Sequence, residues 1–281
     1  MADSLFLFSD GQFLRTGKPL ISPDNRSFRY GDGFFETMKW KSGELLLTKY
    51  HMERLFYSLE ILKFNPPVFF TPSYIIEAVN ALIKKNQHHH LARVRITVYR
   101  GDGGIYDHQN HFPHLLIQTW ELNESNNRLN ENGLELGIFS KAIKAADHFS
   151  MIKSNNYLPY VMAAIWAKEE KLNDAILLNQ NGDIVDSTIA NIFIVSNGII
   201  KTPPLTDGPV DGVMRKHIID QLKKLEYEIE EKSISLEDLA NASAVFLTNA
   251  IYGIRWVKKI GETHYSPDFI RAIFYKTASI T

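Results

Sequence analysis

One lysine lies between two expected elements in the stretch His148-Phe149-Ser150-Met151-Ile152-Lys153-Ser154-Asn155-Asn156-Tyr157-Leu158-Pro159. An apolar, strand-like end precedes Lys153, and three small polar residues lead from it into a helix. A lysine that is fixed on rigid elements and partly desolvated loses part of its preference for the ammonium form. Its amine then becomes available as a nucleophile or base, as an imine-forming lysine requires. Because most lysines of such a chain are solvated surface charges, other residues must support this interpretation.

Composition restricts the class of protein. The 281 residues predict two domains. The formal net charge of −1 argues against nucleic acid and anionic membranes as partners. The absence of cysteine excludes disulfides, thiolate nucleophiles and cysteine-based metal sites. Because the start, Met1-Ala2-Asp3-Ser4, has no basic signal region and no apolar run reaches the length of a membrane span, we expect a cytoplasmic protein.

The order of patterns predicts an α+β fold with two α/β domains. A hairpin is expected around Ser9-Asp10-Gly11, and a helix with a Thr71 cap and Pro72 at its first position. Residues 1–120 would form the N-terminal domain and residues 133–281 the C-terminal domain. Residues 121–132 are polar, rich in asparagine and without periodicity, and are therefore expected to be the linker.

Several motifs have both an ordinary and a functional interpretation. The helix expected over 157–171 carries apolar residues at helical spacing, which predicts a core stripe: Leu158, Val161, Met162, Ile165 and Trp166. The triple His88-His89-His90 has no acidic or cysteine partners, so no metal site is expected. The strand 91–99 places Arg93 and Arg95 on its non-core face, where they are solvated or await a carboxylate or phosphate.

Two further positions also have both an ordinary structural interpretation and a functional one. Asp186 lies between two apolar strands, where an aspartate is more often a turn-former than a catalyst. Gly212-Val213-Met214-Arg215 begins a helix, and backbone amides at a helix start form an anion site or simply a glycine-capped end.

Taken together, the motifs resemble the class IV, or fold type IV, pyridoxal-phosphate enzymes. This family includes branched-chain and D-amino-acid transaminases and aminodeoxychorismate lyase. The resemblance spans nearly the whole chain, because six blocks stand in the family's order. They are Tyr30-Gly31-Asp32-Gly33-Phe34-Phe35-Glu36, His51-Met52-Glu53-Arg54-Leu55, Ile152-Lys153-Ser154-Asn155-Asn156-Tyr157, residues 186–193, Gly212-Val213-Met214-Arg215, and Phe246-Leu247-Thr248-Asn249-Ala250.

The resemblance implies roles around the cofactor ring of pyridoxal 5'-phosphate. Lys153 would hold the cofactor as an imine and, once released, would move the proton between the substrate α-carbon and the cofactor C4′. Asp186 would keep the pyridine nitrogen protonated, and Tyr157 would contact the ring hydroxyl.

The resemblance also implies a phosphate cradle and a homodimer. Arg54 would clamp the phosphate, Val213 and Met214 would offer backbone amides, and Thr248 and Asn249 would complete the cradle. In this family the active sites lie between the two domains and borrow residues from a second subunit.

This chain departs from the family's pattern around the cofactor. The family usually has glutamate in place of Asp186, so here the side chain is one methylene shorter. Met214 replaces a threonine that many transaminases use for the phosphate, and it points to the lyase branch.

The residues expected to bind the substrate also depart from the family's pattern. The arginine and histidine that bind the substrate carboxylate in D-amino-acid enzymes fall near Ile105 and Asp107, which cannot do so. Arg29 and Arg95 are therefore our candidates for that carboxylate. Phe35 and Ala250 complete the expected substrate-binding set.

Three functions are compatible with these residues. The first is transamination between an amino acid and a 2-oxo acid. The block Gly31 to Glu36 favours the D-amino-acid series, with branched-chain L-amino acids as the alternative. The second is elimination of pyruvate from aminodeoxychorismate. The third is a non-catalytic scaffold, which the presence of both Lys153 and Arg54 argues against.

Overall fold

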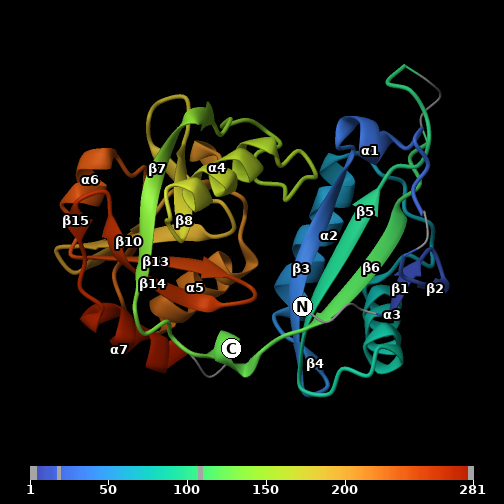
Figure 1. Cartoon of the computed structure of the whole chain (residues 1–281), viewed down its shortest axis with the longest axis horizontal. Coiled ribbons are helices and arrows are strands. Elements are labelled where there is room, and N and C mark those ends of the chain that lie inside the picture. The colour runs from blue at the N-terminus through green and yellow to red at the C-terminus, as the bar shows by residue number, and fades with distance from the viewer. Residues whose placement is uncertain (1–4, 18–19, 107–109, 278–281) are drawn as a thin grey trace. The chain divides into compact units, whose positions relative to one another are not determined.

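The computed structural model describes residues 5–17, 20–106 and 110–277, and the chain divides into two compact units (Figure 1). The first unit contains Met1–Asn126 together with Ile152–Asn156, and the second contains Asn127–Met151 and Tyr157–Thr281. The change between units at residues 126 and 127 falls within the segment expected to be a linker. Five residues around Lys153 belong to the first unit, although both of their flanks belong to the second.

The first unit is built on a six-stranded antiparallel sheet with the order β2-β1-β6-β5-β3-β4. The expected hairpin around Asp10-Gly11 is present and joins the first two strands. The strands are β1 (Phe6–Ser9), β2 (Gln12–Arg15), β3 (Gly33–Lys41), β4 (Glu44–Leu45), β5 (Leu91–Tyr99) and β6 (His114–Glu121).

Two helices cover the apolar face of this sheet. Helix α2 (Thr48–Ile61) packs on β3, and α3 (Pro72–Lys85) packs on β1 and β6. Thr71 caps α3 as predicted, because its side chain accepts a hydrogen bond from the backbone N–H of Tyr74. On β5, Val94, Ile96 and Val98 are fully buried beneath the helices, whereas Arg93 and Arg95 point to the opposite face and are half-buried.

A short helix that the sequence did not predict, α1 (Arg26–Tyr30), precedes β3. Asn25 caps it, and Gly31 ends it in the left-handed conformation with φ 66°. Next to this turn the backbones approach closely. A Cβ atom at Gly33 would lie 2.5 Å from the Val98 carbonyl oxygen and 2.7 Å from Asn155 Nδ2, so only glycine fits there.

The segment around Lys153 pairs with the free edge of β3. Phe34 and Ser154 form an antiparallel bridge. The Phe35 N–H donates to the Lys153 carbonyl at 2.9 Å, and the Asn155 N–H donates to the Gly33 carbonyl at 2.9 Å. Backbone hydrogen bonds at Lys153 and Asn155 therefore fix this segment to β3.

The second unit contains a nine-stranded sheet that closes on itself. Strands β10, β13, β14, β7, β8 and β9 pair in succession, and β9 returns to β10 through Asp186 and Asn191. A closed barrel leaves fewer free strand edges than an open sheet. The strands are β7 (Leu134–Ile143), β8 (Asp174–Leu178), β9 (Ile184–Ser187), β10 (Asn191–Ser196), β11 (Ile199–Thr202), β12 (Ile229–Glu231), β13 (Ala244–Asn249), β14 (Gly253–Ile260) and β15 (Thr263–His264).

Four α-helices surround these strands: α4 (Leu158–Glu169), α5 (Val213–Lys224), α6 (Leu236–Ala240) and α7 (Asp268–Thr277). Helix α4 packs on β7 and β8, while α5 and α7 pack on β13. Within the described residues, the structure contains no helix that is both long and apolar enough to cross a membrane.

The prediction for the core face of α4 was wrong. The helix buries Tyr160, Ala163 and Ala167. Four residues of the expected core stripe are exposed instead: Leu158 by 69%, Val161 by 46%, Met162 by 44% and Ile165 by 46%. Only Trp166 of that stripe packs inward, with its ring centroid 5.6 Å from that of Phe139. The apolar face of α4 therefore needs a different explanation.

Candidate active site

In the first unit, Lys153 lies beside two predicted substrate-binding residues. Its Nζ is 4.8 Å from the ring centroid of Phe35, and the Arg95 guanidinium carbon lies 3.7 Å from the same centroid. All three side chains are at least half-buried. An amine that can act as a nucleophile thus shares an aromatic platform with a group that can bind a carboxylate.

Arg54 lies close by in a buried ion network. Its Nε donates to Glu36 Oε1 at 2.7 Å, and its terminal NH2 group donates to Glu36 Oε2 at 2.6 Å. His51 Nδ1 is 2.7 Å from Glu36 Oε2. The three side chains come from β3 and one face of α2, because His51 and Arg54 are three residues apart on the helix. Glu36 therefore fixes the orientation of the guanidinium.

The network has a defined charge state. Burial by itself raises the pKa of Glu36, but Arg54 and His51 lower it to about 2 overall. Burial lowers the pKa of His51, and the nearby charges of Arg54 and Lys153 add to this effect. At neutral pH Glu36 is an anion and His51 is neutral. The influence of Lys153 on His51 places the network within electrostatic reach of the lysine.

The other predicted arginine lies in a different environment. Arg29 is on α1, where it forms an ion pair with Asp24 and donates to the Pro23 carbonyl. Its side chain is 41% exposed. The structure therefore groups Arg95, and not Arg29, with the Lys153 amine, because both contact the Phe35 ring. Ile105 is 57% exposed, and Asp107 lies outside the described residues.

In the second unit, Asp186 is a buried acceptor. It accepts hydrogen bonds from Asn191 Nδ2 at 2.9 Å, from the Val210 N–H at 2.9 Å and from the Tyr160 hydroxyl at 3.0 Å. Burial raises its pKa, and these donors oppose that effect, as does the charge of Lys144. Its position suits a carboxylate that faces a cationic ring nitrogen.

Next to Asp186 the fold leaves donors that suit a phosphate. Helix α5 begins after Gly212, and within the described part of the chain no side chain caps this end. The Thr248 hydroxyl is buried without a hydrogen-bond partner among the described residues. Asn191 connects these features, because it pairs with Thr248 across the strands and a Cβ at Gly212 would lie 1.7 Å from its Oδ1. An orphaned hydroxyl beside an uncapped helix start fits the phosphate of pyridoxal phosphate.

The remaining predicted residues surround this region. Val213 and Met214 form the first turn of α5, as expected for backbone amides that face a phosphate. Asn249 uses its side-chain oxygen to accept from the N–H groups of Ile251 and Tyr252, so its side chain shapes the turn that contains Ala250. The Tyr157 hydroxyl donates to the Thr188 carbonyl at 3.3 Å, and its ring stacks on Tyr160.

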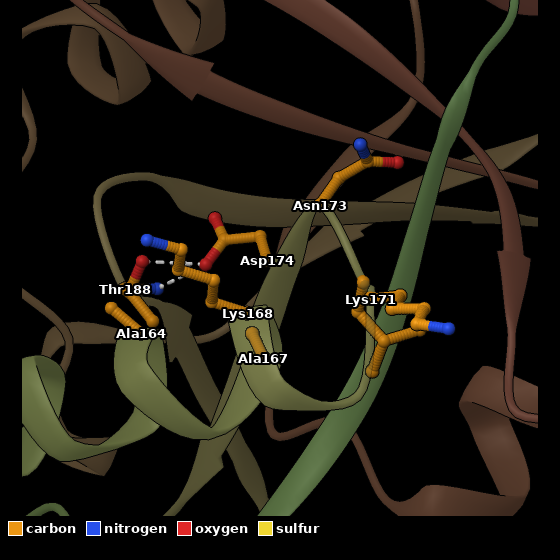
Figure 2. Close-up of a pocket in the computed structure, with 8 residues that line it drawn as sticks. Ala164, Ala167, Lys168, Lys171, Asn173, Asp174 and Thr188 are labelled. Atoms are coloured by element: carbon orange, nitrogen blue, oxygen red, sulfur yellow. Dashed lines mark hydrogen bonds between the residues drawn. The ribbon is translucent and has the colours of Figure 1, made fainter.

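A second buried carboxylate, Asp174, lies among hydrogen-bond donors of its own. Its Oδ1 accepts from the Ala175 N–H and from both the N–H and the hydroxyl of Thr188. Figure 2 shows this carboxylate turned toward Thr188, at a cavity of about 390 Å³ beside the C-terminal end of α4. Of the described residues that line this cavity, none belongs to the predicted site.

Several functional residues were not assigned a role from sequence. Glu36 and His51 lie in the quoted blocks, and the helical spacing of His51 and Arg54 was a usable signal. Asn191 also lies in a quoted block, five residues after Asp186. Tyr160 and Lys144 had no such signal, because their proximity to Asp186 arises from long-range packing.

Comparisons with known proteins identify the family of this chain. The family model described as "Amino-transferase class IV" matches residues 33–260. An aminodeoxychorismate lyase from Vibrio harveyi is 29% identical over 87% of this chain and 89% of its own. A putative branched-chain-amino-acid aminotransferase from Methanocaldococcus jannaschii is 29% identical over 86% of this chain and 83% of its own.

Among solved structures, a branched-chain aminotransferase from Thermoproteus uzoniensis, determined with norvaline, superposes with a TM-score of 0.87. It is 26% identical and covers 98% of this chain and 93% of its own. The expected mixed α/β architecture of fold type IV is therefore confirmed.

Proposed function

The chain belongs to the class IV aminotransferases, which depend on pyridoxal 5'-phosphate, and we propose that it moves an amino group between an amino acid and a 2-oxo acid. One observation carries the proposal: the Lys153 amine and the Arg95 guanidinium lie on the same Phe35 ring. The reaction needs an amine that reaches the α-carbon and a guanidinium that holds the carboxylate of the same substrate, and both groups contact this ring.

When bound, pyridoxal phosphate supplies an aldehyde that joins amines and a ring that accepts electrons from the reacting carbon. Lys153 would hold the cofactor through its Nζ, and the same amine would take the proton from the substrate α-carbon. Asp186 keeps the ring nitrogen protonated, and Tyr157 orients the ring hydroxyl.

Each unit, taken by itself, carries groups that suit a phosphate. Arg54 contributes a guanidinium whose orientation is fixed by Glu36. The N–H groups of Val213 and Met214 and the Thr248 hydroxyl contribute neutral donors. Anchoring the phosphate leaves the ring in one position for the Lys153 amine, which reduces the entropy cost of the reaction.

A substrate panel tests the proposal. The protein is incubated with D- and L-alanine, glutamate and leucine together with 2-oxo acids, and product amino acids are measured. Reaction of the D series would support the preference predicted from the block Gly31 to Glu36. Reaction of the L series alone would favour the branched-chain alternative, which the name of the relative from M. jannaschii supports.

The second candidate function is the lyase reaction. The relative from V. harveyi carries that name, and Met214 stands where many transaminases have threonine. Release of pyruvate from aminodeoxychorismate, without amino transfer to any 2-oxo acid in the panel, would replace the transaminase proposal.

We expect Arg95→Ala to raise the KM for the amino acid by about 10- to 100-fold, the effect of losing a hydrogen-bonded charge pair. The dissociation constant for pyridoxal phosphate should change much less, because Arg95 is not among the residues proposed for the phosphate. Steady-state kinetics and cofactor titration measure the two effects. Arg29→Ala is the companion variant, and a larger rise in KM from Arg29→Ala than from Arg95→Ala would reverse our assignment.

The apolar face of α4 supports a homodimer, which the resemblance also implies. Leu158, Val161, Met162 and Ile165 are exposed on successive turns of one helix. Clustered exposed apolar side chains on a soluble protein are typical of an interaction surface. A second copy of the chain is the occupant that we propose for this face.

We expect Val161→Glu to convert the dimer into a monomer, because a buried unpaired carboxylate at an interface costs several kcal/mol. Light scattering coupled to size-exclusion chromatography measures the mass. Lys223→Glu, at an exposed position of a different helix, α5, is the matched control and should remain dimeric. A dimer that survives Val161→Glu would place the interface elsewhere.

A further inference from the structure

Asp186 is held in one orientation by three donors from different elements. Asn191 donates to Oδ1, while the Val210 N–H and the Tyr160 hydroxyl both donate to Oδ2. A carboxylate offers about four lone-pair positions. The described residues therefore fill both positions of Oδ2 and one of Oδ1, which leaves one position on Oδ1 for a further donor.

Tyr160 is the only one of these donors whose position depends on a long side chain, and the fold fixes that side chain firmly. It is buried on the inner face of α4, with 4% of its surface exposed. Its ring stacks on Tyr157 with centroids 4.4 Å apart and an interplanar angle of 24°. The hydroxyl reaches Asp186 from a helix that packs on β7 and β8.

We propose that Tyr160 is a positioning residue that fits the short carboxylate of Asp186 to the pyridine nitrogen of the cofactor. The inference rests on the proposed function. An aspartate reaches about 1.5 Å less far than the glutamate usual in the family, one carbon–carbon bond. The tyrosine hydroxyl reaches Oδ2 from the side of α4. It thereby turns Oδ1 toward the N–H of the protonated pyridine ring. Tyr160 and Asp186 together thus replace one longer side chain.

The charges around Asp186 agree with this role. Burial raises the pKa of Tyr160 well above 10, and the nearby carboxylate of Asp186 adds to the effect. The tyrosine therefore keeps its proton and acts toward Asp186 as a donor. Lys144 is the other charged group that faces Asp186, and Tyr157 faces Tyr160. A protonated ring nitrogen would face Oδ1 of an ionised Asp186, whose Oδ2 already accepts two hydrogen bonds.

The test is the affinity of the full-length protein for pyridoxal phosphate, measured without substrate. Tyr160→Phe keeps the ring packing and removes only the hydroxyl, and we expect the dissociation constant to rise about tenfold. Because the Tyr160 hydrogen bond helps to keep Asp186 ionised, the pH below which affinity declines should also move upward.

The matched control is Tyr265→Phe. Tyr265 is another buried tyrosine of the second unit, and its hydroxyl donates to the Leu239 carbonyl at 3.0 Å, away from Asp186. This variant loses one buried hydrogen bond, as Tyr160→Phe does, but should bind the cofactor like the wild type. Thermal unfolding of both variants without cofactor compares their stabilities directly.

A rescue variant separates positioning from general damage. In Tyr160→Phe/Asp186→Glu the longer acid reaches the ring nitrogen unaided, so most of the lost affinity should return. The inference is overturned if Tyr160→Phe binds the cofactor as well as Tyr265→Phe, or if the double variant binds no better than Tyr160→Phe. A wild-type protein that forms no borohydride-reducible link with pyridoxal phosphate would refute the proposed function itself.

Discussion

Lys153→Ala is expected to abolish the absorbance of bound pyridoxal phosphate that borohydride bleaches, and to lower kcat by at least about 10³-fold. Both effects follow from one amine, because it would hold the cofactor and move the substrate proton. The backbone of Lys153 is hydrogen-bonded to Phe35, so replacement of its side chain leaves the segment in place. Absorption spectra before and after borohydride, and the turnover rate with the best substrate of the panel, measure the two losses.

Lys144 is the other lysine whose amine could react with the cofactor, so the experiment must distinguish it from Lys153. Burial lowers the pKa of Lys144, which makes it the second candidate for a reactive amine. Its Nζ donates to the Ser150 carbonyl at 3.0 Å, and it lies near Asp186. Mass spectrometry of the borohydride-reduced protein should locate the cofactor on Lys153. A label on Lys144, or absorbance that persists in Lys153→Ala, would transfer the catalytic role to the other lysine.

Glu36→Gln should destabilise the protein by about 3 kcal/mol at neutral pH. Removing one member of a buried ion pair typically costs 3–5 kcal/mol, and glutamine retains part of the hydrogen bonding. The pKa of Glu36 leads to a similar figure, since a value of about 2 against the ordinary 4.5 corresponds to about 3 kcal/mol. Urea unfolding at pH 7 measures the difference. Glu60→Gln, at an exposed position of α2, should change stability by less than about 0.5 kcal/mol.

The pH dependence of this effect has a definite sign. The pKa of Glu36 is lower in the folded protein, so its contribution is complete above pH 4.5 and is lost as the pH falls toward 2. The pKa of His51 is also lowered, so stability begins to decline once the pH falls below 6.5. The gap between wild type and Glu36→Gln should therefore narrow in acid. A gap that is the same at pH 7 and pH 3 would show that the ion network contributes little.

Glu36→Gln should also weaken cofactor binding, because the carboxylate orients the guanidinium proposed for the phosphate. This effect separates a structural ion pair from a functional one. If stability falls while the affinity for pyridoxal phosphate is unchanged, Arg54 serves the fold of the first unit and not the phosphate.

The parts of the fold that follow local rules could be predicted from sequence. The hairpin at Asp10-Gly11, the Thr71 cap and the alternation along β5 each depend on neighbouring residues, and all three are confirmed. The apolar face of α4 could not be assigned, because periodicity shows that a helix has an apolar side but not what covers it. Small residues such as Ala163 and Ala167 form its packed side instead.

The residues of the candidate site also fall into those that local motifs predict and those that only the fold brings together. Lys153, Arg54 and Asp186 were located because motifs mark them, whereas their partners became visible only in the folded chain. The pairing of Lys153 with β3 joins residues more than one hundred positions apart, and Tyr160 reaches Asp186 across 26 positions. Such contacts depend on the tertiary fold, for which a single sequence has no local signal. The departure from glutamate at Asp186 was readable, but its compensation by Tyr160 was not.

The strands β9 and β10 meet at Asp186 and Asn191, so the acid proposed for the ring nitrogen is also part of the seam that closes the barrel. A substitution that removes this carboxylate therefore also loosens the architecture, and its activity has to be judged against its melting temperature. Conversely, a ligand that binds only when this seam is closed stabilises the folded barrel. At a free ligand concentration of 100 times the dissociation constant, binding adds about 2.7 kcal/mol to the free energy of unfolding. Cofactor supply during expression would then raise the amount of folded protein.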